Sequence, residues 1–246
     1  TATLVAEELQ QLGYSLALGR EVVNESSRMG LPDELTLQLE FERARQQGAL
    51  AQWIAAFEGG FTGIVATLDT GRPGPVMAFR VDMDALDLSE EQDVSHRPYR
   101  DGFASCNAGM MHACGHDTHM ASLLGAAQIL AEFRDELNGS VKFLFQPAEE
   151  INLGAKKMME LNCVEDPKVD AIFGMHNSPE IPVGTVAVKN GPLIILWQPP
   201  NLTRTSPVPP LTQAQNQKTV TMPCWRQHKQ LLHCMQSPRT AKALPE

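Results

Sequence analysis

Residues 117–150, DTHMASLLGAAQILAEFRDELNGSVKFLFQPAEE, join a helical pattern to a strand pattern and decide the fold. Apolar side chains in the first part recur at the spacing of one helix face, at Met120, Leu123, Leu124, Ala127 and Leu130. The run SVKFLFQ at 140–146 is continuous enough in apolar residues to predict a strand buried on both faces. A helix that leads into such a strand favours an α/β domain with a largely parallel core sheet.

Weaker patterns on both sides of this stretch extend the same alternation. Helices are expected at residues 3–12, 32–47, 49–57 and 152–161, with Asp33 as the N-cap of the second. Further strands are expected at residues 62–69, 75–82, 170–174 and 184–189, the last as an edge strand. The Gly-Arg-Pro-Gly sequence between the first two of these strands predicts that they form a β-hairpin. Residues 87–109 are polar and rich in turn residues, so we expect a loop there.

The composition is that of a globular chain and excludes several classes of protein. The 246 residues are 43% hydrophobic and 20% charged, which argues against a wholly disordered chain. No apolar stretch approaches the ~20 residues of a membrane span, and the first residues show no secretory signal. The net charge of −9 argues against nucleic acid or an anionic membrane as a partner. Five cysteines, an odd number without a secretory signal, indicate reduced thiols and a cytoplasmic location.

The chain changes character near residue 194. Residues 194–246 carry a net charge of +5, against −14 for residues 1–193. They hold 8 of the 17 prolines and none of the 18 glycines, and they show neither a helical nor a strand period. We therefore expect a folded domain at 1–193 and an atypical, disordered tail at 194–246.

Residues able to do chemistry follow the ends of three predicted strands. Asp82 and Asp84 come after one strand, Glu149 and Glu150 after another, and His176 after a third. In open α/β sheets, sites form outside the carboxyl ends of the strands. These side chains are therefore expected to meet in one pocket.

A fourth segment, MHACGHDTH at 111–119, lies at the start of the long helix. Cys114 and His116 are one residue apart and could face one ion, and together with carboxylates they suit a divalent transition metal. Taken alone, a Cys-x-His is more often a buried thiol beside a surface histidine. His112 and His119 could equally be ordinary residues at a helix start.

The adjacent carboxylates Glu149 and Glu150 leave two interpretations open. Acidic side chains stabilise a helix N-terminus by about 0.3–1 kcal/mol, which needs no catalytic role. Alternatively, one carboxylate binds a metal ion while the other transfers a proton.

Taken together, these motifs resemble the M20 family of metallopeptidases and amidohydrolases. The matching strings stand in the family's order: AFRVDMDAL (78–86), MHACGHD (111–117), FQPAEE (145–150) and GMHN (174–177). The likeness covers roughly residues 1–193 and is to the subgroup of hippurate, indole-acetyl-amino-acid and aminobenzoyl-glutamate hydrolases. It implies a zinc-peptidase-like, three-layer αβα catalytic domain that hydrolyses the amide bond of a small N-acyl amino acid, most closely aminobenzoyl-glutamate. It also implies assembly with a related B subunit or as a homodimer.

The resemblance assigns roles to single residues. The positions that match metal ligands, for two implied ions of Mn²⁺ or Zn²⁺, are Cys114, His116, Glu150 and His176. Glu149 matches the general acid/base, which would deprotonate a water and protonate the departing amine. Asp82 joins Glu149 in the catalytic set and, like Asp84 and Asp117, is expected to orient the ligands.

The chain departs from the family in its length and in its tail. Family members continue beyond Gly191 with a smaller dimerisation domain and the rest of the catalytic domain, which brings one more histidine ligand. Here the likeness stops near Leu193, as expected of a truncated or frameshifted chain, and the setting of His228 and His233 does not match the family's motif. The alternative is therefore an incomplete remnant that binds metal without turnover. Two other possibilities are a thiol hydrolase with Cys114 as nucleophile and a zinc-stabilised interaction module that includes Cys106.

Overall fold

The computed structural model describes residues 1–179, 181–188 and 218–221. The chain divides into two compact units, and the described part of the first is residues 1–177. The second unit spans residues 178–231. Within it, the described strands β6 (Thr185–Val188) and β7 (Lys218–Thr221) pair antiparallel. All other described elements belong to the first unit.

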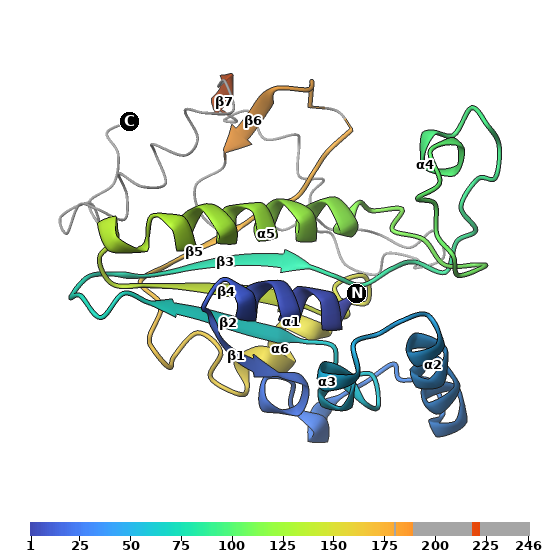
Figure 1. Cartoon of the computed structure of the whole chain (residues 1–246), viewed down its shortest axis with the longest axis horizontal. Coiled ribbons are helices and arrows are strands. Elements are labelled where there is room, and N and C mark those ends of the chain that lie inside the picture. The colour runs from blue at the N-terminus through green and yellow to red at the C-terminus, as the bar shows by residue number, and fades with distance from the viewer. Residues whose placement is uncertain (180, 189–217, 222–246) are drawn as a thin grey trace, which may run out of the picture. The chain divides into compact units, whose positions relative to one another are not determined.

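A five-stranded mixed sheet forms the centre of the first unit (Figure 1). Its strands are β1 (Ser15–Leu18), β2 (Ile64–Asp69), β3 (Val76–Asp82), β4 (Ser140–Gln146) and β5 (Ala171–Gly174). The order across the sheet is β1-β2-β4-β3-β5. Strand β3 runs parallel to both β4 and β5, whereas β2 is antiparallel to both β1 and β4. The prediction of an α/β fold is confirmed, but the sheet is less parallel than expected.

The predicted hairpin between β2 and β3 is wrong, because β4 lies between them. The short connection instead crosses the beginning of β4, where the backbone N–H groups of Gly139 and Ser140 donate to the carbonyls of Arg72 and Pro75. Strand β4 is buried along six of its seven residues and therefore takes the central position. Burial of this apolar strand on both sides outweighs the local preference of the turn sequence.

A row of three phenylalanines crosses the parallel strands. Phe79 of β3 is paired in register with Phe143 of β4 and Phe173 of β5. The ring centroids of Phe79 and Phe143 are 5.6 Å apart, and those of Phe79 and Phe173 are 5.4 Å apart. This phenylalanine row fixes the register of the three strands, because cross-strand aromatic pairs contribute beyond the area they bury.

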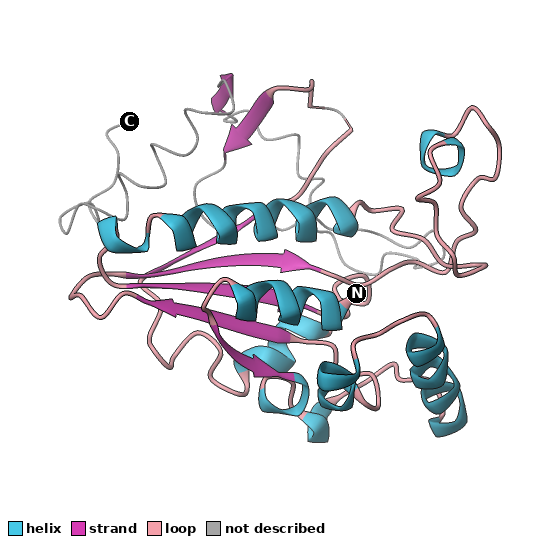
Figure 2. Ribbon diagram, viewed as in Figure 1, coloured by secondary structure: helices cyan, strands magenta, loops and turns pink. Residues whose placement is uncertain are grey.

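Helices and short helical turns surround the sheet (Figure 2). The α-helices are α1 (Ala2–Gln11), α2 (Glu34–Gln46), α3 (Ala51–Ile54), α4 (Arg97–Arg100), α5 (His116–Glu132) and α6 (Gly154–Met159). The 3-10 turns are η1 (Gly19–Glu21), η2 (Glu25–Ser27), η3 (Ala55–Phe57) and η4 (Arg134–Glu136). None of the described helices is both long enough and apolar enough to cross a membrane.

Apolar side chains cover both faces of the sheet. On one face, Leu9 of α1 and Leu123 of α5 pack in a cluster with Ala66 and Phe143 of the sheet. On the other face, a second cluster holds Val22, Val23 and Phe61 together with Val65 and Leu144 of the sheet and Met158 of α6. The alternation of Ala66 with Val65, and of Phe143 with Leu144, is the period-two pattern of a strand with two buried faces.

Most of the predicted elements are present at the predicted positions. Helices α1, α2, α5 and α6 and strands β2 to β6 fall where the patterns place them, and Asp33 caps α2 through a 2.7 Å hydrogen bond from the Thr36 backbone N–H. Strand β1 was not predicted, and α4 lies within the expected loop.

The tail expected to lack regular structure contains the strand β7 at Lys218–Thr221, where Thr219, Val220 and Thr221 favour the extended backbone. The expected disorder of the other residues of 194–246 lies outside the described part of the chain. Strand β6, expected at a sheet edge, pairs with β7 rather than with the five-stranded sheet.

Gly154 at the start of α6 permits a close approach that any side chain would block. A Cβ atom there would stand 1.6 Å from the carbonyl oxygen of Pro147, whereas one at Gly125 in α5 would contact nothing within 4 Å. Gly154→Ala is expected to lower the free energy of unfolding by about 1–3 kcal/mol. The matched variant Gly125→Ala should raise it by about 0.5–1 kcal/mol, because alanine restricts the unfolded chain more than glycine does. Urea unfolding of both variants tests this, and equal effects would contradict the clash.

Tyr14 predicts a specific dependence of stability on pH. Its hydroxyl donates to the Ala127 carbonyl oxygen at 2.9 Å, and burial raises the pKa of Tyr14 above its ordinary value. Above about pH 10 the unfolded chain loses this proton while the folded chain keeps it, so stability declines as the pH rises towards the folded pKa. Tyr14→Phe should cost about 0.5–1.5 kcal/mol at neutral pH. This difference from the wild type should shrink above pH 10 in urea unfolding, and a constant difference would contradict the pKa shift.

Candidate metal centre

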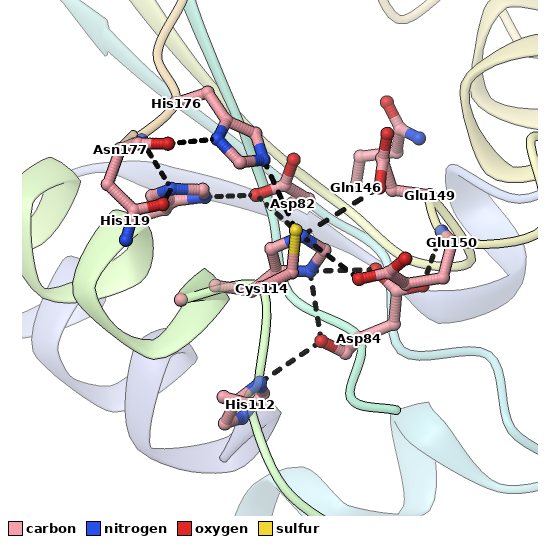
Figure 3. Close-up of polar contacts among 12 residues, drawn as sticks. Asp82, Asp84, His112, Cys114, His119, Gln146, Glu149, Glu150, His176 and Asn177 are labelled. Carbon is pink, nitrogen blue, oxygen red and sulfur yellow. Dashed lines mark hydrogen bonds and ion pairs between the residues drawn. The ribbon is translucent and has the colours of Figure 1, made fainter. Parts of the chain in front are cut away.

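The parallel register of β3, β4 and β5 brings the carboxyl ends of these three strands to the same edge of the sheet. Asp82, the last residue of β3, is paired with Gln146, the last residue of β4. Arg80 is paired with Gly174 of β5, so that His176, two residues further on, comes level with Asp82. The turn after β4 adds Glu149 and Glu150 at the same edge. The side chains expected to meet at the carboxyl ends of the strands do so in the structure (Figure 3).

The N-terminus of α5 completes this cluster. His116 is the first residue of the helix and is fully buried, and Cys114 precedes it by two residues. Gly115, the N-cap, has a left-handed backbone with φ of +82°, and a Cβ atom there would stand 2.2 Å from the side chain of Asn177. Glycine therefore allows the turn after β5 to pass close to the start of α5.

Asp84 connects three parts of the cluster. Its backbone carbonyl accepts hydrogen bonds from Nδ1 of His112 and Nδ1 of His116, each at 3.0 Å. Its carboxylate Oδ2 accepts the backbone N–H of Glu150 at 2.9 Å. With Nδ1 held in this way, His116 presents Nε2 towards the carboxylates, at 3.6 Å from Oε1 of Glu150 and 3.7 Å from Oε2 of Glu149.

The donor set fits a divalent cation. Cys114, His116 and Glu150 each offer one ligand atom, and these atoms lie within 4.8 Å of one another. His176 adds Nε2 at 3.5 Å from the Cys114 sulfur. Thiolate, imidazole and carboxylate together are the ligands of zinc-like transition metals, with manganese also accommodated by the carboxylates.

Unpartnered buried atoms mark the position that such an ion would fill. Four buried side-chain atoms have no hydrogen-bond partner among the described residues: Asp82 Oδ2, Asp84 Oδ1, His116 Nε2 and Glu150 Oε1. Asp82 Oδ2 does keep an ion pair with Arg80 at 3.1 Å. Each buried polar atom without a partner costs about 1–3 kcal/mol. A cation bound among these atoms removes much of that cost.

The electrostatics of the cluster also favour a cation. Burial raises the pKa of the Cys114 thiol to about 11, and the negative charge of Glu150 adds to the rise. Burial likewise raises the pKa of Glu149, with a further contribution from Asp82. Burial acts in the same direction on Asp82, but the hydrogen bond from His119 and nearby positive charges hold the pKa of Asp82 below its usual range. A divalent ion would reverse the penalty on the thiolate and on the carboxylates.

The structure brings together all but one of the site residues predicted from the sequence. Those that meet in the cluster are Asp82, Asp84, Cys114, His116, Glu149, Glu150 and His176. Asp117, expected to orient a ligand, is exposed, and its carboxylate accepts the backbone N–H of Thr118 at 2.9 Å, outside the cluster. Its place in the first turn of α5 suits an acidic side chain at a helix N-terminus.

Sequence reasoning did not assign His119 and Asn177, which the structure places in the cluster. His119 is 2% exposed, with Nδ1 at 2.5 Å from Asp82 Oδ1 and Nε2 at 2.6 Å from Asn177 Oδ1. The available signal was spacing, because residues three apart share one face of a helix, which places His119 beside His116.

Comparison with known proteins identifies related sequences. The sequence profile of peptidase family M20/M25/M40 matches residues 78–240, a range that continues past Leu193, where the likeness was expected to stop. The chain is 76% identical over 186 residues to the A subunit of p-aminobenzoyl-glutamate hydrolase from Escherichia coli (strain K12), covering 76% of this chain and 42% of that protein. It is 60% identical over 186 residues to indole-3-acetyl-aspartic acid hydrolase of Enterobacter agglomerans, with the same coverage of 76% and 42%.

A solved structure gives a similar result. The aminobenzoyl-glutamate utilization protein from Klebsiella pneumoniae matches with a TM-score of 0.60 and 47% sequence identity, over 75% of this chain and 40% of that chain. The chain thus spans about two fifths of the length of the proteins it matches.

Two aspartates that sequence reasoning treated alike should differ in their effect on metal binding. Oδ2 of Asp84 accepts the Glu150 N–H, and Oδ1 lies 3.3 Å from Nδ1 of His116, so in Asp84→Asn the amide nitrogen must face one of these two groups, donor against donor. Loss of these supporting contacts is expected to weaken Mn²⁺ affinity about 10–100-fold in isothermal titration calorimetry. The matched variant Asp117→Asn removes the same charge outside the cluster and should leave the affinity unchanged. Equal losses in the two variants would show that net charge, rather than position, determines binding.

Proposed function

The chain belongs to peptidase family M20/M25/M40, and we propose that it hydrolyses the amide bond of an N-acyl amino acid, with p-aminobenzoyl-glutamate as substrate. The names of the two similar hydrolases each describe an aromatic acyl group joined to an acidic amino acid. The proposed substrate class is therefore an aromatic acyl conjugate of glutamate or aspartate.

The observation that carries the proposal is the set of unpartnered buried atoms among metal-ligating side chains. In this proposal Cys114, His116, Glu150 and His176 hold the metal, with two divalent ions, Mn²⁺ or Zn²⁺, in the complete site. A bound divalent ion lowers the pKa of a water and polarises the substrate carbonyl.

Glu149 is the proposed proton carrier. Its Oε2 lies 3.7 Å from Nε2 of His116, next to the ligand cluster but without a hydrogen bond to it. The Glu149 carboxylate takes a proton from the attacking water, whose oxygen bonds to the carbonyl carbon. The same proton then passes to the amide nitrogen as the carbon–nitrogen bond breaks, which releases the carboxylic acid and the free amino acid.

The contacts around Glu149 and Glu150 support different roles for the two glutamates. Asp84 holds the neighbouring residue through the backbone N–H of Glu150, so the two glutamates keep different directions. Asp84 and Asp82 orient the imidazoles: the backbone carbonyl of Asp84 accepts from Nδ1 of His116, and the carboxylate of Asp82 accepts from Nδ1 of His119. With Nδ1 bound in this way and Nε2 without a hydrogen-bond partner among the described residues, His116 offers Nε2 as a ligand.

The last part of the proposal concerns the protein's subunit assembly, its domain extent and its location in the cell. One relative is named as the A subunit of its hydrolase, which supports assembly with a related B subunit, and a homodimer is the alternative. Residues 1–193 are taken as the part of the catalytic domain present in this chain. The free cysteines among the described residues, Cys106, Cys114 and Cys163, are consistent with the cytoplasmic location proposed here.

The test is release of p-aminobenzoate from p-aminobenzoyl-glutamate by manganese-loaded protein. Glu149→Gln keeps the size of the side chain and removes its ability to carry a proton, so release should fall by about 10²–10⁴-fold. Mn²⁺ titration of the same variant should show unchanged stoichiometry, because Glu149 is not a proposed ligand.

A matched substitution separates proton transfer from metal binding. Glu150→Gln should lower Mn²⁺ affinity as well as release, unlike Glu149→Gln. Metal binding by the wild type with background release in all three proteins would instead identify a chain that binds metal without turnover.

A further inference from the structure

Two histidines of the cluster share one pattern of contacts. His116 directs Nδ1 to the Asp84 carbonyl at 3.0 Å, and His176 directs Nδ1 to the Asn177 carbonyl at 2.5 Å. Nε2 of His116 has no hydrogen-bond partner among the described residues, and Nε2 of His176 faces the Cys114 sulfur. A backbone carbonyl on one ring nitrogen, with the second nitrogen directed at other ligand atoms, is the arrangement of a metal-binding imidazole.

His119 does not share this pattern. Its ligand atom lies within 4.8 Å of those of Asp82, His116 and His176, so proximity alone would make it a ligand. However, both of its ring nitrogens are already occupied. Nδ1 donates to Asp82 Oδ1 at 2.5 Å, since a carboxylate only accepts. Nε2 lies 2.6 Å from Oδ1 and 2.9 Å from the backbone nitrogen of Asn177.

These contacts join three elements that are distant in the sequence (Figure 3). Asp82 ends β3, His119 lies in the first turn of α5, and Asn177 belongs to the turn that follows β5. The Asn177 carbonyl in turn holds Nδ1 of His176. The ring of His119 also packs against that of His176, with centroids 4.5 Å apart. The buried imidazole of His119 thus holds the backbone of Asn177 and packs against the ring of His176.

We propose that His119 is a positioning residue, not a metal ligand, which locks the turn after β5 to β3 and so directs Nε2 of His176 towards Cys114. The proposal deepens the proposed function, because it rests on His176 being a ligand in the same metal site. Asp82 is the anchor of this lock, and its own position is set by Arg80, which also binds Gln146 at 2.8 Å.

Cobalt(II) binding distinguishes a positioning residue from a ligand. Thiolate-to-cobalt absorption reports the bond to Cys114, and titration gives affinity and stoichiometry. His119→Ala should retain the thiolate band and the stoichiometry of the wild type while affinity falls about 10–100-fold. The matched variant His176→Ala should lose a ligand and change the visible spectrum. A spectrum or stoichiometry for His119→Ala that matches His176→Ala would overturn the proposal.

Conservative variants address the two sides of the ring separately. In His119→Asn the amide nitrogen can still donate to Asp82, and in His119→Gln the longer amide can still reach Asn177. The variant that keeps the Asn177 contact should recover more cobalt affinity than the one that keeps only Asp82. Equal recovery, or none, would contradict a lock that acts through Asn177.

A measurement without metal separates this inference from the proposed function. In the metal-free protein, urea midpoints are compared for His119→Ala, Asn177→Ala and the double variant. If the two side chains form one lock, the double variant unfolds at nearly the same urea concentration as the less stable single variant. Additive shifts would overturn the lock, whatever the metal data show. Failure of the wild type to bind cobalt would overturn the metal site while leaving this comparison valid.

Discussion

The phenylalanine row is the contact on which the candidate site depends. Phe143, Phe79 and Phe173 stand in register on β4, β3 and β5, with stacked rings. Three residues beyond this row, along the same three chain segments, come Gln146, Asp82 and His176. A slip of one residue in any strand would turn its last side chain to the opposite face of the sheet. The stacking of these three rings across the parallel strands therefore determines which polar groups meet at the edge.

Helix α5 contributes to the same cluster through its first turn. Its partial positive charge faces Asp82, Asp84 and the two glutamates, which partly offsets their mutual repulsion. The offset is incomplete, because four polar atoms keep no hydrogen-bond partner among the described residues. The fold thus places negative charge and unpartnered ligand atoms close together. This is the preorganisation that a metal site requires.

Local patterns predicted the elements, and which side chains gather at the sheet edge, better than they predicted the pairing of strands. Strand β4 was expected to be buried on both faces and is, because that expectation depends only on its own composition. The hairpin of β2 and β3 was wrong because the turn between them is a local signal, whereas pairing with β4 depends on residues some seventy positions away. Position within a helix also decided which polar residues face inwards. Once His116 is buried, His119 shares its face and Asp117 does not. The motif alone does not contain that distinction.

Strand β5 holds its part of the cluster less firmly than the inner strands hold theirs. It lies at the edge of the five-stranded sheet, and Ile172, Phe173 and Met175 are each at least 40% exposed. Asp82 ends the inner strand β3, Glu150 follows the inner strand β4, and His116 begins α5, whereas His176 follows this edge strand, where local opening requires less free energy than in the inner strands. A cation bound by His176 together with ligands on the inner strands and α5 would oppose the separation of β5 from the sheet. Metal binding and the pairing of β5 with β3 are then thermodynamically coupled. The protein without metal should therefore lose order first at β5.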